Sequence, residues 1–266
     1  MSTMTPQPRA VLLLDIDGVI RDVGGSYRRA IAETVQHFSG WRPEPAEIDS
    51  LKPEGRWNND WEASAELLRR HGRTASSPSQ QPAFSTLVDV FNGFYFGGDP
   101  DGDPSSWSGF IGDEPLLVCK DFFTELSEAD LAWGFVSGAE PPSARYVLVQ
   151  RLELVQPPLK AMGDAPDKPN PEGLLQLARE LIGGDLGPQA PPVAYLGDTV
   201  ADVLTVVNAR KAYPLQRFFA FGVAPPHLHH NPVQRRKHEQ ELLSMGADAV
   251  IDATTTILSA LQDHLP

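Results

Sequence analysis

Short apolar runs that end in polar residues constrain the fold of this chain more than any other feature. The first run, residues 9–14 (RAVLLL), stops at Asp15-Ile16-Asp17-Gly18. Runs of this length without polar alternation are typical of strands buried on both faces of a parallel sheet. Four further runs have the same character: 131–136 (LAWGFV), 192–196 (PVAYL), 217–223 (RFFAFGV) and 247–251 (ADAVI).

Helical patterns separate these runs. Residues 172–182 (EGLLQLARELI) and 201–212 have apolar residues at helical spacing. Strands that alternate with helices predict an α/β fold with a doubly wound, Rossmann-like parallel sheet.

The segment from residue 24 to about residue 115 interrupts this alternation. It has no clear buried strand, but residues 26–38, 58–71 and 83–96 have helical patterns, the second with Asn58 as its N-cap. We therefore predict a core made of residues 1–22 and 116–266, with a helical domain, residues 23–115, inserted after the first strand.

Charge and cysteine content limit the classes of partner. The 266 residues carry a formal net charge of −13, which repels nucleic acid and anionic membranes and leaves a small anion to be bound by local positive charge. Cys119 is the single cysteine, so no internal disulfide can form, and a reducing cytoplasm is the expected location. The early apolar run, residues 10–14, is too short for a signal peptide or a membrane span.

Polar residues follow the predicted strands at their carboxyl ends, where open α/β sheets bind their ligands. Lys168 stands before the helix that leads to the third of the runs. The residues at the strand ends are Asp15 and Asp17 after the first run, Ser137 and Gly138 after the second, and Asp198 and Asp202 after the third.

Clustered carboxylates with a lysine suit the transfer of a phosphoryl group. Carboxylates repel one another unless a divalent cation neutralises them, and oxygen ligands favour Mg²⁺. One carboxylate can attack phosphorus while a second carboxyl group protonates the leaving oxygen and later activates water.

Four motifs in order resemble those of the haloacid-dehalogenase (HAD) superfamily. They are DIDGVIRD at 15–22, FVSG at 135–138, DKPNP at 167–171 and GDTVAD at 197–202. The resemblance implies a magnesium-dependent phosphatase with a helical C1-type cap, as in subfamily I, that closes over a small phosphorylated metabolite.

The resemblance also implies a role for each matching residue. Asp15 would be the nucleophile and a metal ligand. Asp17 would be the general acid and base and bind the metal through its carbonyl group. The other implied roles are a phosphoryl contact for Ser137, charge stabilisation for Lys168, metal ligation for Asp198, ligation or orientation for Asp202, and substrate contacts for Gly18 and Gly138.

Two alternatives remain open. Asp17 favours phosphoryl transfer, because dehalogenases and phosphonoacetaldehyde hydrolases lack this second aspartate, but DGVIRD is also similar to β-phosphoglucomutase, so a mutase is one alternative. The other is a non-catalytic binding or regulatory module, which the complete set of motif residues disfavours.

Residues that set substrate specificity are harder to predict. The cluster KPEGRWNNDW offers Lys52, Arg56, Trp57 and Asn58, although tryptophan packing, helix capping and solvated charge explain it equally well. Arg21 is a further candidate for ligand contact. His227, His229 and His230 could bind zinc, but a surface loop is the simpler interpretation.

The identity of the substrate stays open between several classes of metabolite. Sugar phosphates, phosphoglycolate-like acids and amino-alcohol phosphates all suit a C1 cap. Histidinol phosphate is a further candidate, because some HAD relatives are fused to a histidine-biosynthesis dehydratase. The sequence does not predict an oligomeric state.

Overall fold

The structure is a computed structural model that describes residues 7–51, 59–74 and 81–265. The chain divides into two compact units. One, Met1–Asp22 with Leu116–Pro266, is called the sheet unit below; the other, Val23–Pro115, is called the helical unit.

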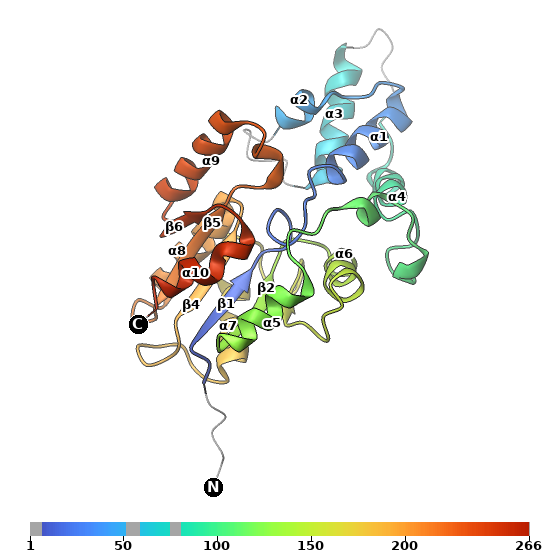
Figure 1. Ribbon diagram of the computed structural model, residues 1–266. Helices are drawn as coiled ribbons and strands as arrows, with labels where there is room; N and C mark the ends of the chain where they lie inside the picture. Colours follow the sequence, from blue (N-terminus) through green and yellow to red (C-terminus); the bar gives the residue numbers. More distant parts are fainter. Residues whose placement is uncertain (1–6, 52–58, 75–80, 266) are drawn as a thin grey trace. The chain divides into compact units, whose positions relative to one another are not determined.

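The sheet unit contains a six-stranded, fully parallel sheet in the order β3-β2-β1-β4-β5-β6. Figure 1 labels β1, β2, β4, β5 and β6. Strand order reverses between β1 and β4, which is the arrangement of a doubly wound Rossmann-like sheet. The predicted fold class is therefore confirmed. The strands are β1 (Ala10–Leu14), β2 (Leu131–Val136), β3 (Leu159–Lys160), β4 (Val193–Gly197), β5 (Phe218–Val223) and β6 (Ala249–Ile251).

Alternate residues of β1 supply two separate hydrophobic cores. Leu12 and Leu14 pack on the face covered by α5 (Lys120–Glu128), α6 (Pro141–Arg145) and α10 (Ile257–Gln262). Val11 and Leu13 pack on the opposite face against α7 (Glu172–Ile182), α8 (Val200–Ala212) and α9 (Pro232–Ser244). Helices on both faces bury the whole strand, which explains why its sequence is a continuous apolar run.

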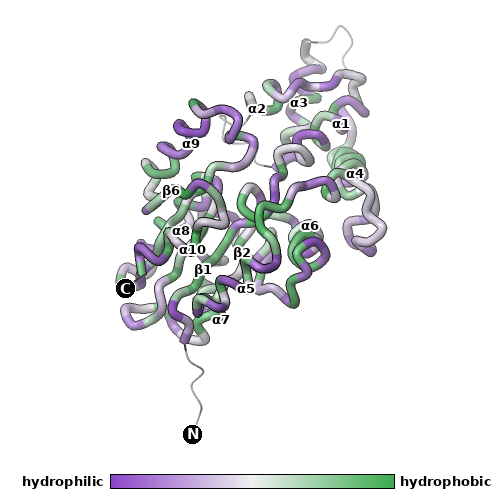
Figure 2. Tube along the Cα trace, viewed as in Figure 1, coloured by the Kyte–Doolittle hydropathy of each residue, from purple (hydrophilic) through white to green (hydrophobic). Residues whose placement is uncertain are grey.

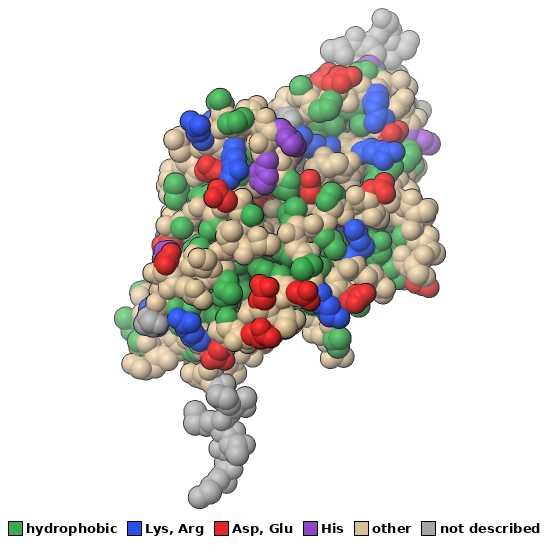
Figure 3. All heavy atoms as spheres, in the orientation of Figure 1, with side chains coloured by type: hydrophobic (Ala, Val, Ile, Leu, Met, Phe, Trp, Pro, Cys, Tyr) green, Lys and Arg blue, Asp and Glu red, His purple; other side chains and the backbone are tan. Residues whose placement is uncertain are grey.

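The helices that cover this sheet differ in character: α5 and α7 are amphipathic, whereas α9 is polar on nearly all sides. Helix α5 buries Phe122, Phe123 and Leu126, while its exposed positions are polar and include Asp121, Glu125 and Glu128. Figure 3 shows acidic side chains on this face of the sheet unit. Helix α9 is mostly hydrophilic, and Leu242 is its buried residue (Figure 2). No helix among the described residues is both long enough and apolar enough to cross a membrane.

All regular structure described in the helical unit is helical. The helices α1 and α4 pack through buried apolar residues and a stack of Tyr27 on Tyr95, with ring centroids 4.5 Å apart. The helices are α1 (Tyr27–Ser39), α2 (Pro45–Asp49), α3 (Asp60–Thr74) and α4 (Phe84–Tyr95).

Two details of the helical unit differ from the prediction or extend it. Helix α3 begins at Asp60, and Asn59 accepts hydrogen bonds from the backbone N–H groups of Trp61 and Glu62, so the N-cap lies one residue later than predicted. The buried carboxylate of Glu114, near the end of the unit, accepts hydrogen bonds from the hydroxyl of Ser26, near its start, and from that of Tyr95 in α4.

Replacing Leu12 by Ala tests the importance of the central strand. Leu12 is fully buried between its partners Trp133 and Ala194, so Leu12→Ala should lower the free energy of unfolding by about 2–5 kcal/mol. Urea denaturation measures this loss. Leu215→Ala is the control, because Leu215 is 73% exposed and its removal should change stability by less than about 0.5 kcal/mol. Equal losses in both variants would contradict this assignment of the core.

Candidate active site

The ends of β1 and β4 bring the predicted site residues together where the strand order reverses. Asp15 directly follows β1, and its backbone N–H donates to the carbonyl of Leu196 in β4 at 2.9 Å. Asp198 follows β4, and Asp202 lies in the first turn of α8. Oxygen atoms of Asp15, Asp198 and Asp202 lie within 4.8 Å of one another.

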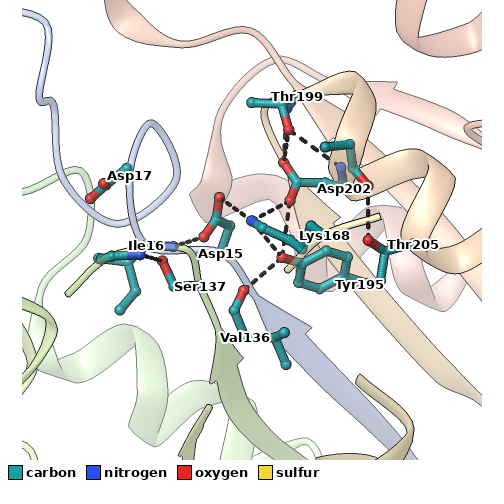
Figure 4. Close-up of polar contacts among 12 residues, drawn as sticks. Asp15, Ile16, Asp17, Val136, Ser137, Lys168, Tyr195, Thr199, Asp202 and Thr205 are labelled. Atoms are coloured by element: carbon teal, nitrogen blue, oxygen red, sulfur yellow. Dashed lines mark hydrogen bonds and ion pairs between the residues drawn. The ribbon is translucent and has the colours of Figure 1, made fainter. Parts of the chain in front are cut away.

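Lys168 lies between two of these carboxylates (Figure 4). Its Nζ is 2.9 Å from Asp15 Oδ2 and 2.5 Å from Asp202 Oδ1. The side chain is 15% exposed, so this ammonium group is largely removed from water. Buried charges of this kind persist only when opposite charges and hydrogen bonds satisfy them, as they do here.

Asp202 has hydrogen bonds at both carboxylate oxygens. Oδ1 accepts from Lys168 and from the hydroxyl of Tyr195, at 2.5 and 3.1 Å. Oδ2 accepts from the backbone N–H and the hydroxyl of Thr199, at 2.9 and 2.6 Å. Thr199 and Asp202 thereby form the capping box that starts α8. These contacts suit a residue that orients Lys168 more than a metal ligand.

The three carboxyl groups of the cluster have pKa values that are shifted in different directions. Burial of Asp15 raises its pKa to about 6, against the opposing effect of Lys168. Desolvation and the neighbouring Asp202 raise the pKa of Asp198 well above its usual range. Burial also acts to raise the pKa of Asp202, but the Lys168 ammonium and the Thr199 hydrogen bonds lower it below its ordinary value.

Lys168 and Tyr195 respond to the same surroundings. Burial alone would lower the pKa of Lys168, yet Asp15 and Asp202 raise it well above its ordinary value, so the amine stays charged. Burial, with the nearby carboxylate of Asp202, raises the pKa of Tyr195, so its hydroxyl stays neutral. The Tyr195 hydroxyl lies 2.7 Å from the carbonyl of Val136. The site therefore holds the positive charge of Lys168 between the carboxylates of Asp15 and Asp202.

The donor set fits a hard divalent cation. Asp15 and Asp198 supply carboxylate oxygens that burial and mutual repulsion make reluctant to ionise, and a divalent cation relieves that repulsion. Among the residues that the structure describes, this is the one cluster of acidic, histidine or cysteine side chains close enough to share an ion.

Two glycines allow the close approach of the site loops. Gly18 has φ +76°, and a Cβ at this position would lie 2.2 Å from Asp198 Oδ2. A Cβ on Gly197 would lie 2.2 Å from that of Asp202. Larger residues would displace the carboxylates, so Gly18 has a packing function in addition to its predicted contact with substrate.

Ser137 and Gly138 follow β2 beside the cluster. The N–H of Ser137 donates to the Lys160 carbonyl, and its Oγ accepts from the N–H of Ala139 at 3.2 Å. Ser137 is buried and Gly138 is exposed. The strand ends thus bring Ser137 to the same edge of the sheet as Asp15 (Figure 4).

Asp17 and Arg21 pair with each other. Asp17 lies outside the three-carboxylate cluster, and its Oδ1 accepts from Arg21 Nε at 2.7 Å. The Arg21 side chain, which the sequence suggested for ligand contact, is fully buried.

Other predicted residues are separate from this cluster or are not described. Lys52, Arg56, Trp57 and Asn58 lie outside the described residues. His227, His229 and His230 are exposed and belong to no metal-binding group among the residues searched, and His229 bonds to the carbonyl of Ala224.

Three contributors were missed by reasoning from sequence. Thr199 could have been found, because Thr199-x-x-Asp202 is the pattern of a capping box. Tyr195 was visible as the one polar hydroxyl in the run PVAYL. His238, on α9, gave no local signal, yet its Nε2 lies 2.8 Å from the backbone carbonyl of Asp198.

No family model matches the chain. One curated relative, named imidazoleglycerol-phosphate dehydratase, from Phytophthora nicotianae, is 31% identical over 221 residues. This match covers 82% of the chain but 44% of the relative, so the chain spans less than half of the length of that protein.

Solved structures share the fold over 78% to 99% of the chain. Phosphatase Tt82 from Thermococcus thioreducens is 23% identical, with a TM-score of 0.61 over 78% of this chain and 91% of that one. A phosphonoacetaldehyde hydrolase-like protein from Oleispira antarctica is 18% identical, with a TM-score of 0.67 over 99% and 96%. A HAD family hydrolase from Deinococcus radiodurans R1 is 17% identical, with a TM-score of 0.65 over 97% of each chain.

The fold and site define a doubly wound α/β protein with carboxylates and a lysine at the carboxyl edge of its sheet. The solved structures give this class its name: the chain has the haloacid-dehalogenase fold. The resemblance found in the four motifs is confirmed at the level of the fold.

The raised pKa of Asp15 predicts a pH-dependent effect on stability. Between its ordinary pKa of 3.8 and its folded value of about 6, the folded protein holds a proton that the unfolded chain releases. The contribution of Asp15 to stability therefore falls as pH rises through this window. In EDTA, Asp15→Asn should raise the melting temperature by several degrees more at about pH 7.5 than at about pH 4.5.

Asp185→Asn provides the matched control for this measurement, because Asp185 is exposed. Its melting temperature should follow that of the unmodified protein at both pH values. A difference between Asp15→Asn and the unmodified protein that does not change with pH would contradict the raised pKa.

Proposed function

We propose that this protein is a magnesium-dependent phosphatase that hydrolyses a small organic phosphate monoester through a phosphorylated Asp15. The observation that carries this proposal is the position of Lys168, which contacts both Asp15 and Asp202 at the carboxyl ends of parallel strands. Motif order, the HAD fold and the acidic cluster support the same activity.

The first half of the reaction transfers the phosphoryl group to the protein. A carboxylate oxygen of Asp15 attacks phosphorus, and the bond from phosphorus to the leaving oxygen breaks. Asp17 gives its proton to that oxygen. Lys168 and Ser137 stabilise the charge on the phosphoryl oxygens.

The second half restores the protein. Water attacks the phosphorus of phospho-Asp15, Asp17 accepts the proton of the water, and the bond to Asp15 breaks to release inorganic phosphate. The two half-reactions add up to hydrolysis, and Asp17 ends as it began.

Mg²⁺ would be held by Asp15, Asp198 and the carbonyl of Asp17, and it would supply charge neutralisation for the phosphoryl oxygens. Asp202, which is bonded at both oxygens, would orient Lys168. The helical unit would be the cap, with Lys52, Arg56, Trp57 and Asn58 as candidates for specificity.

Asp17 favours a phosphatase over the activity named for the Oleispira antarctica neighbour. The resemblance assigns that chemistry to proteins without the second aspartate, and this chain has it. A mutase would use the same residues, but it would return the phosphoryl group to substrate instead of water.

The substrate belongs to the class of small phosphorylated metabolites. Sugar phosphates, phosphoglycolate-like acids and amino-alcohol phosphates are candidates. The name of the Phytophthora nicotianae relative adds imidazole-bearing phosphates such as histidinol phosphate. The dehydratase activity in that name concerns a protein of which less than half matches this chain.

Replacement of the nucleophile tests the proposal. An aryl phosphate should be hydrolysed with Mg²⁺ and not in EDTA, and Asp15→Asn should lower turnover by at least roughly 1000-fold, because a neutral amide cannot attack phosphorus as the carboxylate does. Acid-quenched protein should contain a phosphorylated peptide that includes Asp15. Asp185→Asn should retain full activity, and appreciable turnover by Asp15→Asn would remove the nucleophile assignment.

The products distinguish the phosphatase from the mutase. A panel of phosphorylated metabolites should give stoichiometric inorganic phosphate from at least one compound, since water accepts the phosphoryl group in the proposed reaction. Conversion of a sugar phosphate to its positional isomer with little phosphate release would establish the mutase. No reaction with any compound or with the aryl phosphate would favour the binding module.

A further inference from the structure

Arg21 is a fully buried arginine beside the candidate active site. Its Nε donates to Asp17 Oδ1 at 2.7 Å, and its Nη2 donates to the hydroxyl of Ser143 at 2.8 Å. Ser143 lies on α6 and is itself fully buried. A guanidinium group is costly to bury, and such burial persists where its fork-shaped set of donors is satisfied.

The backbone fixes Arg21 at the same place. The N–H groups of Ile20 and Arg21 donate to the carbonyl of Ile16 at 2.7 and 3.2 Å, and the N–H of Gly18 donates to the carbonyl of Arg21 at 2.9 Å, so residues 16–21 form a closed loop. The backbone of Arg21 forms an isolated antiparallel β-bridge with Leu116, and the N–H of Leu117 donates to the carbonyl of Ile20 at 2.8 Å. Backbone hydrogen bonds therefore hold the main chain of Arg21, and Ser143 on α6 binds its guanidinium group.

The two oxygens of Asp17 have different surroundings. Oδ1 is held by Arg21, whereas Oδ2 has no hydrogen bond to any of the residues that the structure describes. The Asp17 side chain is 28% exposed, while that of Arg21 is 0% exposed. One oxygen is thus anchored from the protein side, and the other can exchange a proton.

We infer that Arg21 is a positioning residue for Asp17: anchored by Ser143, it fixes Oδ1 and leaves Oδ2 to exchange protons with the leaving oxygen and with water. This inference rests on the proposed function and replaces the expectation that Arg21 contacts the ligand. In this proposal Arg21 acts through the orientation of Asp17 and not through contact with the substrate.

Substrates with different leaving groups test this role. An aryl phosphate with a good leaving group needs no proton in the first half-reaction, but water still needs a base in the second. Arg21→Met should therefore release one equivalent of aryl alcohol in a rapid burst, followed by a steady rate about 10-fold or more below normal. With an alkyl phosphate, whose leaving oxygen needs the proton, the burst should be lost as well.

Two further variants make the result specific. Ser143→Ala removes one hydrogen-bond partner of Arg21 and leaves the arginine in the chain. It should therefore show the same pattern as Arg21→Met with a smaller change in rate, and it tests the role even if Arg21→Met folds poorly. Arg210→Met is the control, because Arg210 forms an ion pair with Asp248 and hydrogen bonds to the carbonyl of Phe218, away from the site. It should lose stability without a burst.

Crystal structures supply a readout independent of turnover. In Arg21→Met the Asp17 carboxylate should leave the position it has in the unmodified protein; an unchanged position would overturn the inference. Equal losses for aryl and alkyl phosphates, with no burst, would also overturn it by showing a merely structural role. If the unmodified protein hydrolyses neither substrate, the proposed function fails, and the position of Asp17 still decides whether Arg21 orients it.

Discussion

The ion pairs of Lys168 with Asp15 and Asp202 are the interaction on which the rest of the site depends. Each charge is buried enough to be unstable alone, and the cation lets both carboxylates remain close together. The lysine belongs to the loop before α7, whereas its partners follow β1 and begin α8. The contact therefore joins three segments of the chain that only the folded sheet brings together.

The parallel sheet supplies this convergence through strand order. The strands β2, β1 and β4 are adjacent and parallel, so their carboxyl ends lie at the same edge of the sheet. Asp15, Ser137 and Asp198 directly follow these strand ends. Helices cover both faces, so the edge is where polar groups can meet without interrupting a hydrophobic core. Gly18 has no side chain, which lets Asp198 lie close to the loop that follows β1.

Most of the fold could be predicted from the sequence, because strands that are buried on both faces appear as continuous apolar runs. It could not reveal β3, since two residues, Leu159 and Lys160, are too few for any periodic pattern. The positions of Asp15, Lys168 and Asp202 relative to the predicted strands and helices predict that they meet at one edge of the sheet, and in the structure Lys168 contacts both carboxylates. It did not foresee the burial of Arg21, because that depends on Ser143, which is 122 residues further along the chain. His238 could not be predicted either, because its partner Asp198 lies 40 residues earlier in the chain.

Different surroundings give the three clustered carboxyl groups different tendencies to ionise, and this division bears on their proposed roles. Asp202 has its pKa lowered by Lys168 and Thr199, which suits a permanent anion that anchors the lysine. Asp15, with a pKa of about 6, and Asp198, with a pKa raised well above its usual range, ionise less readily. A divalent cation would gain most from these two, because its charge replaces the proton that burial favours. Metal affinity should accordingly come from Asp15 and Asp198, while Asp202 would keep Lys168 aligned with Asp15, the proposed nucleophile.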